Sequence, residues 1–224
     1  MKISKNFWED KNLIKTLKNG GVVVMPTDTI YGVVGRAEDI DTVKRIYKIR
    51  KRELSKPFII LIANFSDLEK FGILKSKQSS RSQKMFTLLK KFWPSLSRQD
   101  LDKEVKPISV ILDCSHKKFE YLHRGLNTLA FRLPRQKSLR DLLKITGPLV
   151  APSANIEGFS PSKNIQEAKK YFGNEVDPVR GRGSLRALAT SNGVDLYIDG
   201  GEIKNKASKI IQLHKNGSVS IIRE

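Results

Sequence analysis

The sequence predicts an α/β protein built on a mixed, twisted β-sheet. Short apolar runs typical of strands alternate along the chain with segments whose apolar residues recur at helical spacing. Glycine and proline separate many of these segments, as at Gly20-Gly21 and Gly147-Pro148. The chain has 224 residues, 39% of them hydrophobic, which is enough to bury a full core in one domain.

Helices are predicted where apolar residues repeat with a period near 3.6 and a capping or breaking residue marks one end. Gly20-Gly21 ends the first helix, Asp39 can cap the second, and Pro94 stops the helix that begins at residue 83. The predicted helices span residues 13–18, 40–52, 67–71, 83–92, 139–144 and 165–172.

Strands are predicted in the short apolar runs between these helices. They span residues 22–25, 58–62, 108–112, 128–133, 149–150, 196–198, 209–213 and 219–222. Because strands and helices interleave, we expect helices to flank an open sheet with both parallel and antiparallel neighbours.

Two polar stretches, 96–106 and 177–193, interrupt this rhythm. We expect both to be long surface loops inserted into a single domain that spans residues 1–224. The second stretch is rich in arginine and glycine, which leaves two interpretations open: an arm that contacts RNA, or a plain surface loop.

The chain is strongly basic, with 42 Lys and Arg against 23 Asp and Glu and a formal net charge of +19. Such an excess favours a polyanionic partner, with RNA as the first candidate. The lysines are scattered, so a solvated basic surface without such a partner is the alternative.

Several protein classes find no support in the sequence. No apolar run approaches the roughly 18 residues of a membrane span, and the first ten residues lack the apolar core of a secretory signal. Cys114 is the only cysteine, which fits a reducing compartment, and we expect a cytoplasmic protein. The three histidines lack metal-ligand spacing, and the phosphate-binding, dinucleotide-binding and nucleophile-elbow glycine motifs are absent.

The first group of candidate site residues follows the strand at 22–25. Thr27, Asp28, Thr29 and Tyr31 place hydroxyls and an aromatic ring at the end of a buried strand, where α/β sheets bind ligands. The alternative is a turn held by its own short polar side chains.

The second group is basic. Arg50, Arg52 and Lys56 surround the end of the predicted helix 40–52, and three converging cations suit a polyphosphate. The alternative is a basic helix end that merely favours the helix dipole.

Two further groups end strands. Ser153 and Asn155 follow the run 149–150 and can bind a phosphate, a ribose or a base edge, unless they form a plain loop. Arg132 ends an apolar strand, where a charge needs a partner; that partner is either a ligand carboxylate or phosphate, or a structural salt bridge.

Taken in order, these groups resemble the YrdC-type threonylcarbamoyl-AMP synthases. That family's pattern runs through Pro-Thr-Asp/Glu-Thr-x-Tyr-Gly, Lys-x-Arg, Lys-Pro, Trp-Pro-Gly-Pro, Arg-x-Pro, Pro-Ser-Ala-Asn and Asp-Gly-Gly. This chain carries Pro26-Thr27-Asp28-Thr29-Ile30-Tyr31-Gly32, Lys56-Pro57, Trp93-Pro94, Arg132-Leu133-Pro134, Pro152-Ser153-Ala154-Asn155 and Asp199-Gly200-Gly201. The resemblance covers nearly the whole chain outside the two loops.

The resemblance implies a YrdC-like open twisted sheet with a positively charged concave pocket. It also implies a reaction, in which L-threonine, bicarbonate and ATP give L-threonylcarbamoyladenylate and pyrophosphate. The product would pass to a downstream threonylcarbamoyl transferase complex for N6-threonylcarbamoyladenosine modification of tRNA. Mg²⁺ would be carried by ATP rather than by protein ligands.

The resemblance also implies a role for each candidate residue. Arg50, Arg52 and Lys56 would be catalytic and would neutralise the phosphates. The ATP-binding set would be Arg50, Arg52, Lys56, Ser109, Ser153, Asn155 and Ser208, and the threonine-binding set would be Thr27, Thr29, Tyr31 and Arg132.

The chain departs from the family pattern at three places. Arg50 stands where the family has lysine, Trp93-Pro94-Ser95 breaks the Trp-Pro-Gly-Pro motif, and Ser208-Lys209 replaces a Ser-Thr pair. Two alternatives therefore stay open: a non-catalytic module that binds tRNA or double-stranded RNA on the same fold, or carbamoyl-adenylate chemistry with another acceptor.

Overall fold

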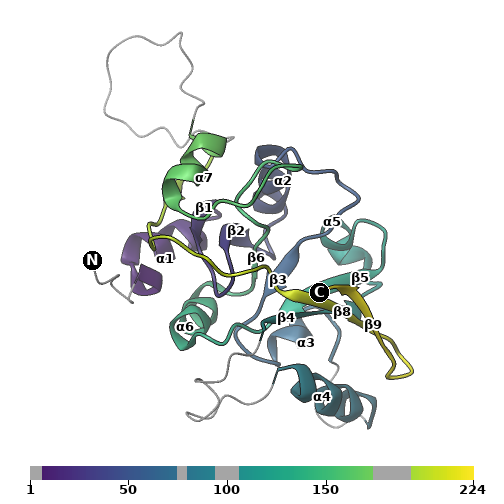
Figure 1. The fold of residues 1–224 in the computed structure, drawn as a ribbon. Coiled ribbons are helices and arrows are strands. Elements are labelled where there is room, and N and C mark those ends of the chain that lie inside the picture. The colour runs from purple at the N-terminus through teal and green to yellow at the C-terminus, as the bar shows by residue number, and fades with distance from the viewer. Residues whose placement is uncertain (1–6, 75–79, 94–105, 174–192) are drawn as a thin grey trace, which may run out of the picture.

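The computed structural model describes residues 7–74, 80–93, 106–173 and 193–224. Within these residues the strands form one nine-stranded mixed sheet in the order β7-β1-β2-β6-β3-β5-β4-β8-β9 (Figure 1). The strands are β1 Val23–Pro26, β2 Tyr31–Arg36, β3 Ile59–Leu61, β4 Ile108–Asp113, β5 Thr128–Arg132, β6 Leu149–Val150, β7 Leu196–Tyr197, β8 Lys209–Leu213 and β9 Val219–Arg223. The pairs β1–β7, β3–β5 and β4–β8 are parallel, and the other neighbours are antiparallel.

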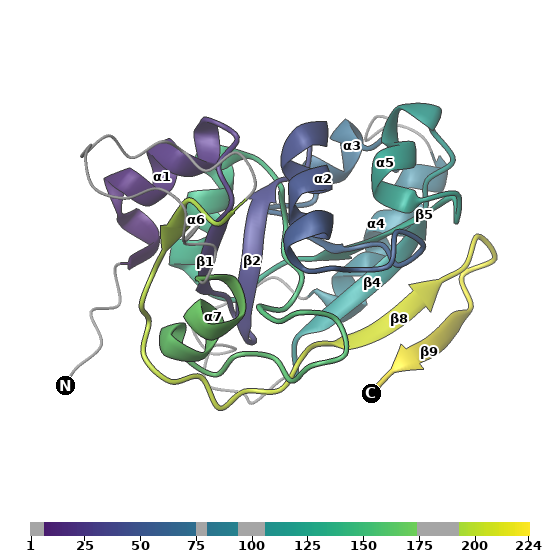
Figure 2. The same ribbon diagram turned by 90° about the horizontal axis from the view of Figure 1, so that it is seen from above.

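Helices flank the sheet. They are α1 Lys11–Lys18, α2 Ile40–Ile49, α3 Asp67–Lys70, α4 Ser80–Phe92, α5 Glu120–His123, α6 Lys137–Thr146 and α7 Ile165–Phe172, with short 3₁₀ helices η1 Phe7–Glu9 and η3 Lys117–Phe119. In the view from above, α1 and α6 lie toward one end of the molecule, α5 lies toward the other, and α2 lies between them (Figure 2). No helix among the described residues is long and apolar enough to cross a membrane.

Strand β1 is buried on both faces of the sheet, where successive side chains point to opposite sides, whereas β9 at the sheet edge is exposed. Val24 packs into a core that includes Val43 and Ile46 of α2. Val23 and Met25, its neighbours on β1, pack into a second core with leucines of α1 and α6. The predicted α/β class is therefore confirmed, with helices that cover both faces.

Strand β2 is the main element that the sequence prediction missed. Only two valines stand at its centre, and Gly32 and Gly35 flank them, so the segment lacks the length of an apolar run. Gly35 is required by packing, because a Cβ there would lie 2.3 Å from Thr42 Cγ2. Antiparallel pairing with β1 makes a hairpin whose turn carries the Thr27–Thr29 segment.

Helix α2 ends earlier than predicted, at Ile49 rather than at residue 52. Arg50 is its C-cap, and Lys51 adopts a left-handed backbone conformation with φ of 47°, which ends the helix. The short α5 was also not predicted. Apart from residues 106 and 193, the two predicted loops lie outside the described residues, so the proposed insertions stay a prediction.

Candidate active site

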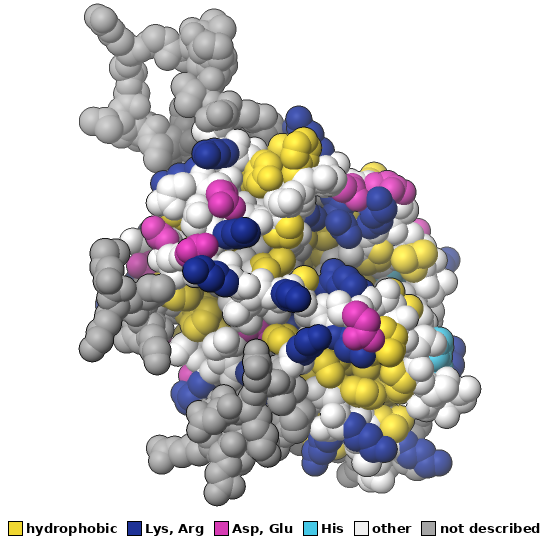
Figure 3. All heavy atoms as spheres, viewed as in Figure 1, with side chains coloured by type: hydrophobic (Ala, Val, Ile, Leu, Met, Phe, Trp, Pro, Cys, Tyr) yellow, Lys and Arg dark blue, Asp and Glu magenta, His cyan; other side chains and the backbone are white. Residues whose placement is uncertain are grey.

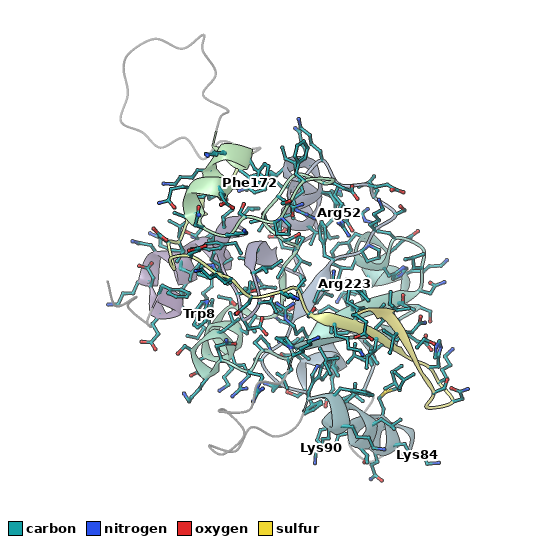
Figure 4. The ribbon with its side chains drawn as sticks, in the orientation of Figure 1. Trp8, Arg52, Lys84, Lys90, Phe172 and Arg223 are labelled. Atoms are coloured by element: carbon teal, nitrogen blue, oxygen red, sulfur yellow. The ribbon has the colours of Figure 1, made fainter. Side chains whose placement is uncertain are left out.

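A cavity of about 200 Å³ lies where several strand and helix ends meet. It is lined by four arginines and four hydroxyl side chains, together with apolar and backbone surface. The arginines are Arg50, Arg52, Arg132 and Arg223, and the hydroxyl residues are Thr27, Thr29, Ser153 and Ser208. Arg52, beyond the end of α2, and Arg223, on β9, lie near the centre of one face (Figure 4). On the same face, Lys and Arg side chains gather across the middle of the surface (Figure 3).

Arg50 is the most buried cation of the site, with an exposed fraction of only 1%. Its guanidinium donates through Nε to the Asn155 carbonyl at 3.0 Å. Nη2 donates to Asn155 Oδ1 at 2.9 Å and to Ser153 Oγ at 3.2 Å. Nη1 is buried and has no hydrogen-bond partner among the described residues. Burial, helped by the nearby Arg52 charge, lowers the pKa of Arg50 to about 10.

Asn155 has no free side-chain donor to offer an anionic ligand. Its Oδ1 accepts from Arg50, while Nδ2 donates to the carbonyls of Ile156 at 2.9 Å and Phe159 at 2.8 Å. Ser153 and Asn155 both contact the Arg50 guanidinium. In this geometry Asn155 positions the arginine.

Arg52 and Lys56 have different surroundings, although the sequence places them together. Arg52 lines the cavity, donates to the Lys56 carbonyl at 3.1 Å and lies over the Phe58 ring at 5.7 Å. The exposed Lys56 ammonium does not line the cavity; it pairs with Glu157 at 2.8 Å and Glu53 at 2.9 Å. These hydrogen bonds raise the pKa of Lys56 and lower the pKa values of both carboxyls.

The turn between β1 and β2 holds its own hydroxyls. Thr27 Oγ1 donates to the Ile30 carbonyl at 2.7 Å, and lies 3.1 Å from Thr29 Oγ1. Both threonines still line the cavity. The Tyr31 side chain is buried and does not line it; its hydroxyl donates to the Gly201 carbonyl at 2.8 Å and accepts from the Gly200 amide at 2.9 Å.

Arg132 and Asp28 form a buried ion pair. Arg132 Nη2 lies 2.8 Å from Asp28 Oδ1, at an angle poorer than that of a good hydrogen bond, and the two side chains are 4% and 1% exposed. The structural salt bridge left open by the sequence therefore exists. The same guanidinium also lines the cavity, and its buried Nε lacks a partner among the described residues.

Residues near the carboxyl end of the chain close the opposite wall. Ser208 Oγ lies 2.8 Å from Ser109 Oγ, and both serines are buried, but only Ser208 lines the cavity. Arg223 donates to the Ser208 carbonyl from Nε at 3.2 Å and from Nη2 at 2.7 Å. Sequence reasoning missed Arg223, although it ends an apolar strand as Arg132 does.

The site is therefore an anion-binding cavity in its composition. Arginine and hydroxyl donors line it, no carboxylate is among the lining residues, and Asp28 is already paired with Arg132. Within the described residues no group of three or more acidic, histidine or cysteine side chains is arranged to hold a metal ion. Such a cavity suits an anionic ligand.

Comparison with known proteins identifies a matching family and several relatives. Residues 15–224 match the family model Sua5/YciO/YrdC, described as telomere recombination. The threonylcarbamoyl-AMP synthase of Pyrococcus abyssi is 30% identical over 191 residues, which are 84% of this chain and 51% of that protein. The Bacillus subtilis protein of the same name is 33% identical over 150 residues, 66% of this chain and 38% of that one. The chain thus spans about half or less of the length of these two relatives.

Solved structures agree. P. abyssi Sua5 complexed with L-threonine superposes with a TM-score of 0.70 at 26% identity, covering 97% of this chain and 54% of that chain. E. coli YciO gives a TM-score of 0.65 at 22% identity, covering 95% of this chain and 87% of that chain, which supports the fold alone. On the family match, the shared fold and the ordered motifs around the cavity, the chain belongs to the Sua5/YciO/YrdC family.

Proposed function

We propose that this protein synthesises L-threonylcarbamoyladenylate from L-threonine, bicarbonate and ATP and releases pyrophosphate. The observation that carries the proposal is the buried Arg50 guanidinium at the cavity. Ser153 and Asn155 hold it, and its Nη1 has no partner in the described part of the chain. A buried donor without a partner is costly, and an anionic ligand oxygen would satisfy it. The names of the relatives fit this reaction.

The reaction depends mainly on the positioning of the substrates and on positive charge around them. The threonine amine and bicarbonate give a carbamate and water. A carbamate oxygen then attacks the α-phosphorus of ATP, a P–O bond to the carbamate forms, and the bond to pyrophosphate breaks. Because this step brings anions together, arginines fixed before the reaction lower its barrier most. Arg50 and Arg52 would stabilise the phosphates, and Arg223 lies on the same cavity.

The threonine end of the cavity would be formed by Arg132, Thr27 and Thr29. Arg132 Nε, which lacks a partner in the part of the chain that the structure describes, suits the substrate carboxylate, while Nη2 stays with Asp28. Tyr31 would act at a distance, because its hydroxyl fixes the Gly200-Gly201 turn.

The remaining candidate residues would act in different ways. Lys56 would have to leave Glu157 and Glu53 to reach a phosphate, which an exposed ion pair permits at small cost. Ser208 would contact ATP directly, whereas Ser109 and Asn155 would act through Ser208 and Arg50. Mg²⁺ would be held by the ATP oxygens, where it would offset phosphate charge.

The product would then serve tRNA modification, through a downstream threonylcarbamoyl transferase complex and, as a further proposed partner, tRNA or double-stranded RNA itself. The net charge of +19 supports contact with RNA. A filter-binding titration with tRNA over a range of salt concentrations tests this part separately from catalysis.

Threonine-dependent release of pyrophosphate from ATP in bicarbonate buffer tests the reaction. We expect release that requires both threonine and bicarbonate. Arg52→Ala should lower the rate by about 100-fold or more, as loss of one charge-stabilising donor does elsewhere. Lys51→Ala is the matched control, because Lys51 is adjacent, exposed and absent from the cavity lining, and it should change the rate by less than about threefold. No threonine-dependent release from the folded protein would rule the proposal out.

A further inference from the structure

A second basic hollow lies on the outer side of α2, beside the candidate active site. It has a volume of about 470 Å³ and is lined by five cations with Tyr47 and Leu54. The cations are Lys44, Lys48, Lys51, Arg52 and Arg124, and no carboxylate is among the lining residues. We call this hollow the α2 groove.

The lysines of the groove follow one side of the helix. Lys44 and Lys48 lie one turn apart on α2, and Lys51 follows just beyond its end. Like charges at this spacing destabilise a helix slightly. Asp41 lies 4.0 Å from Lys44, and its side chain is 97% exposed, whereas Glu53 is bound to Lys56.

Arg124 supplies the second observation that points to a ligand. It has a left-handed backbone conformation with φ of 52°, and its guanidinium lies 4.3 Å from the centre of the Tyr47 ring. Its Nε and Nη2 atoms are shielded from solvent yet have no hydrogen-bond partner among the described residues. A planar guanidinium is the side chain best suited to a phosphate group.

An aromatic pair connects the groove to the active-site cavity. The Tyr47 ring stacks on Phe58 at 4.0 Å between ring centres, and Phe58 and Arg52 both line the cavity. Arg52 lines the groove as well, so one arginine belongs to both sites. The groove is thus a fixed surface and not only a set of long side chains in solvent.

We propose that the α2 groove is a second phosphate-binding site, which takes an oligophosphate chain. Several negative charges within a small volume match five cations around one hollow, and the Arg124 donors gain the partners that they lack. The phosphates come either from a free oligophosphate or from a polynucleotide backbone. The site is independent of the proposed reaction, since it requires binding and no turnover.

Calorimetric titration with inorganic tripolyphosphate tests the proposal. The groove variant is Lys44→Gln/Lys48→Gln/Lys51→Gln. Its matched control is Lys11→Gln/Lys15→Gln/Lys18→Gln, which removes the same charge at the same spacing from α1, where all three lysines are exposed. We expect two equivalents to bind to the wild type and to the control, and one to the groove variant, with at least a tenfold loss of affinity at the lost site.

Arg124→Asn gives an independent check, because asparagine tolerates the left-handed backbone while the guanidinium donors are removed. It should lose the same equivalent, with the melting temperature used to confirm folding. If the groove variant binds the same number of equivalents as the control, with the same affinities, the site does not exist. Because the three lysines are exposed, the groove variant should fold, so its binding can be compared directly with that of the control.

A competition arm separates the two sources of phosphate. If a short duplex RNA displaces tripolyphosphate from the groove, the site binds a polynucleotide backbone; if it does not, the site binds free oligophosphate. Threonine-dependent pyrophosphate release is measured on the same variants. Its absence in the wild type would remove the proposed reaction and leave the binding result intact.

Discussion

Replacing Asn155 with alanine gives the sharpest test of how the site is built. The substitution removes three hydrogen bonds: two from Nδ2 to the carbonyls of Ile156 and Phe159, and one in which Oδ1 accepts from Arg50. A neutral hydrogen bond contributes about 1 kcal/mol to stability and one to a charged group about 1.5–3 kcal/mol. The free energy of unfolding should therefore fall by about 4 kcal/mol.

For a protein of this size, 1 kcal/mol corresponds to a shift of about 2–4 °C in melting temperature, so the Asn155→Ala protein should melt about 8–16 °C lower than the wild type. Ser153→Ala is the control, because it removes one hydrogen bond to the same Nη2 atom of Arg50. It should cost about 1.5 kcal/mol, or roughly 3–6 °C.

Scanning calorimetry and urea unfolding measure both changes, and pyrophosphate release shows whether Arg50 keeps its position. We expect Asn155→Ala to lower the rate at a temperature where the protein remains folded. If it melts within about 2 °C of Ser153→Ala and keeps the wild-type rate, the backbone alone positions Arg50 and the reasoning is wrong.

Three further predictions concern other contacts of the site. Tyr31→Phe removes the hydroxyl that binds the Gly200 amide and the Gly201 carbonyl, and should lower the free energy of unfolding by about 2 kcal/mol. The melting temperature should fall by about 4–8 °C, with little change in the KM for threonine. Asp28→Ala strands the buried Arg132 charge and should cost about 3–5 kcal/mol in urea unfolding; a loss below 1 kcal/mol would show that the charge finds water. The pKa of Glu157 is held below its usual range by Lys56, so its contribution to stability is present above about pH 4.5 and is lost as the pH falls through the lowered value. Melting temperatures measured from pH 6 to pH 3 should therefore fall less steeply for Glu157→Gln than for the wild type, and identical slopes would contradict the ion pair.

The elements that the sequence predicted well are those whose own residues determine them. Helix 165–172 and the strand at 149–150 were predicted with the observed bounds, because capping and apolar patterns are local signals. Strand β2 was missed because its stability comes from pairing with β1 and from glycines that let α2 approach, which are tertiary effects.

The same distinction between local signals and tertiary effects applies to the candidate site. Thr27, Arg50, Arg132 and Ser153 line one cavity. A shared sheet edge does not explain this, because β5, which ends at Arg132, runs opposite to β1 and β6, and Arg50 caps the end of α2. Spacing alone could not show that Lys56 turns to Glu157, since that acid lies far along the chain. Arg223 ends an apolar strand as Arg132 does, but the strand pattern alone could not show that it lines the cavity.

The arrangement of the cavity has a consequence for how the protein is made. Thr27, near the start of the chain, and Arg223, on β9, line the same cavity, and β4 and β8 separate β9 from β5 in the sheet. A nascent chain therefore cannot assemble the anion-binding wall until residue 223 has left the ribosomal exit tunnel. Until then the arginines of the other elements line an unfinished cavity, so a ligand that contacts both Thr27 and Arg223 can bind only after β9 has joined the sheet.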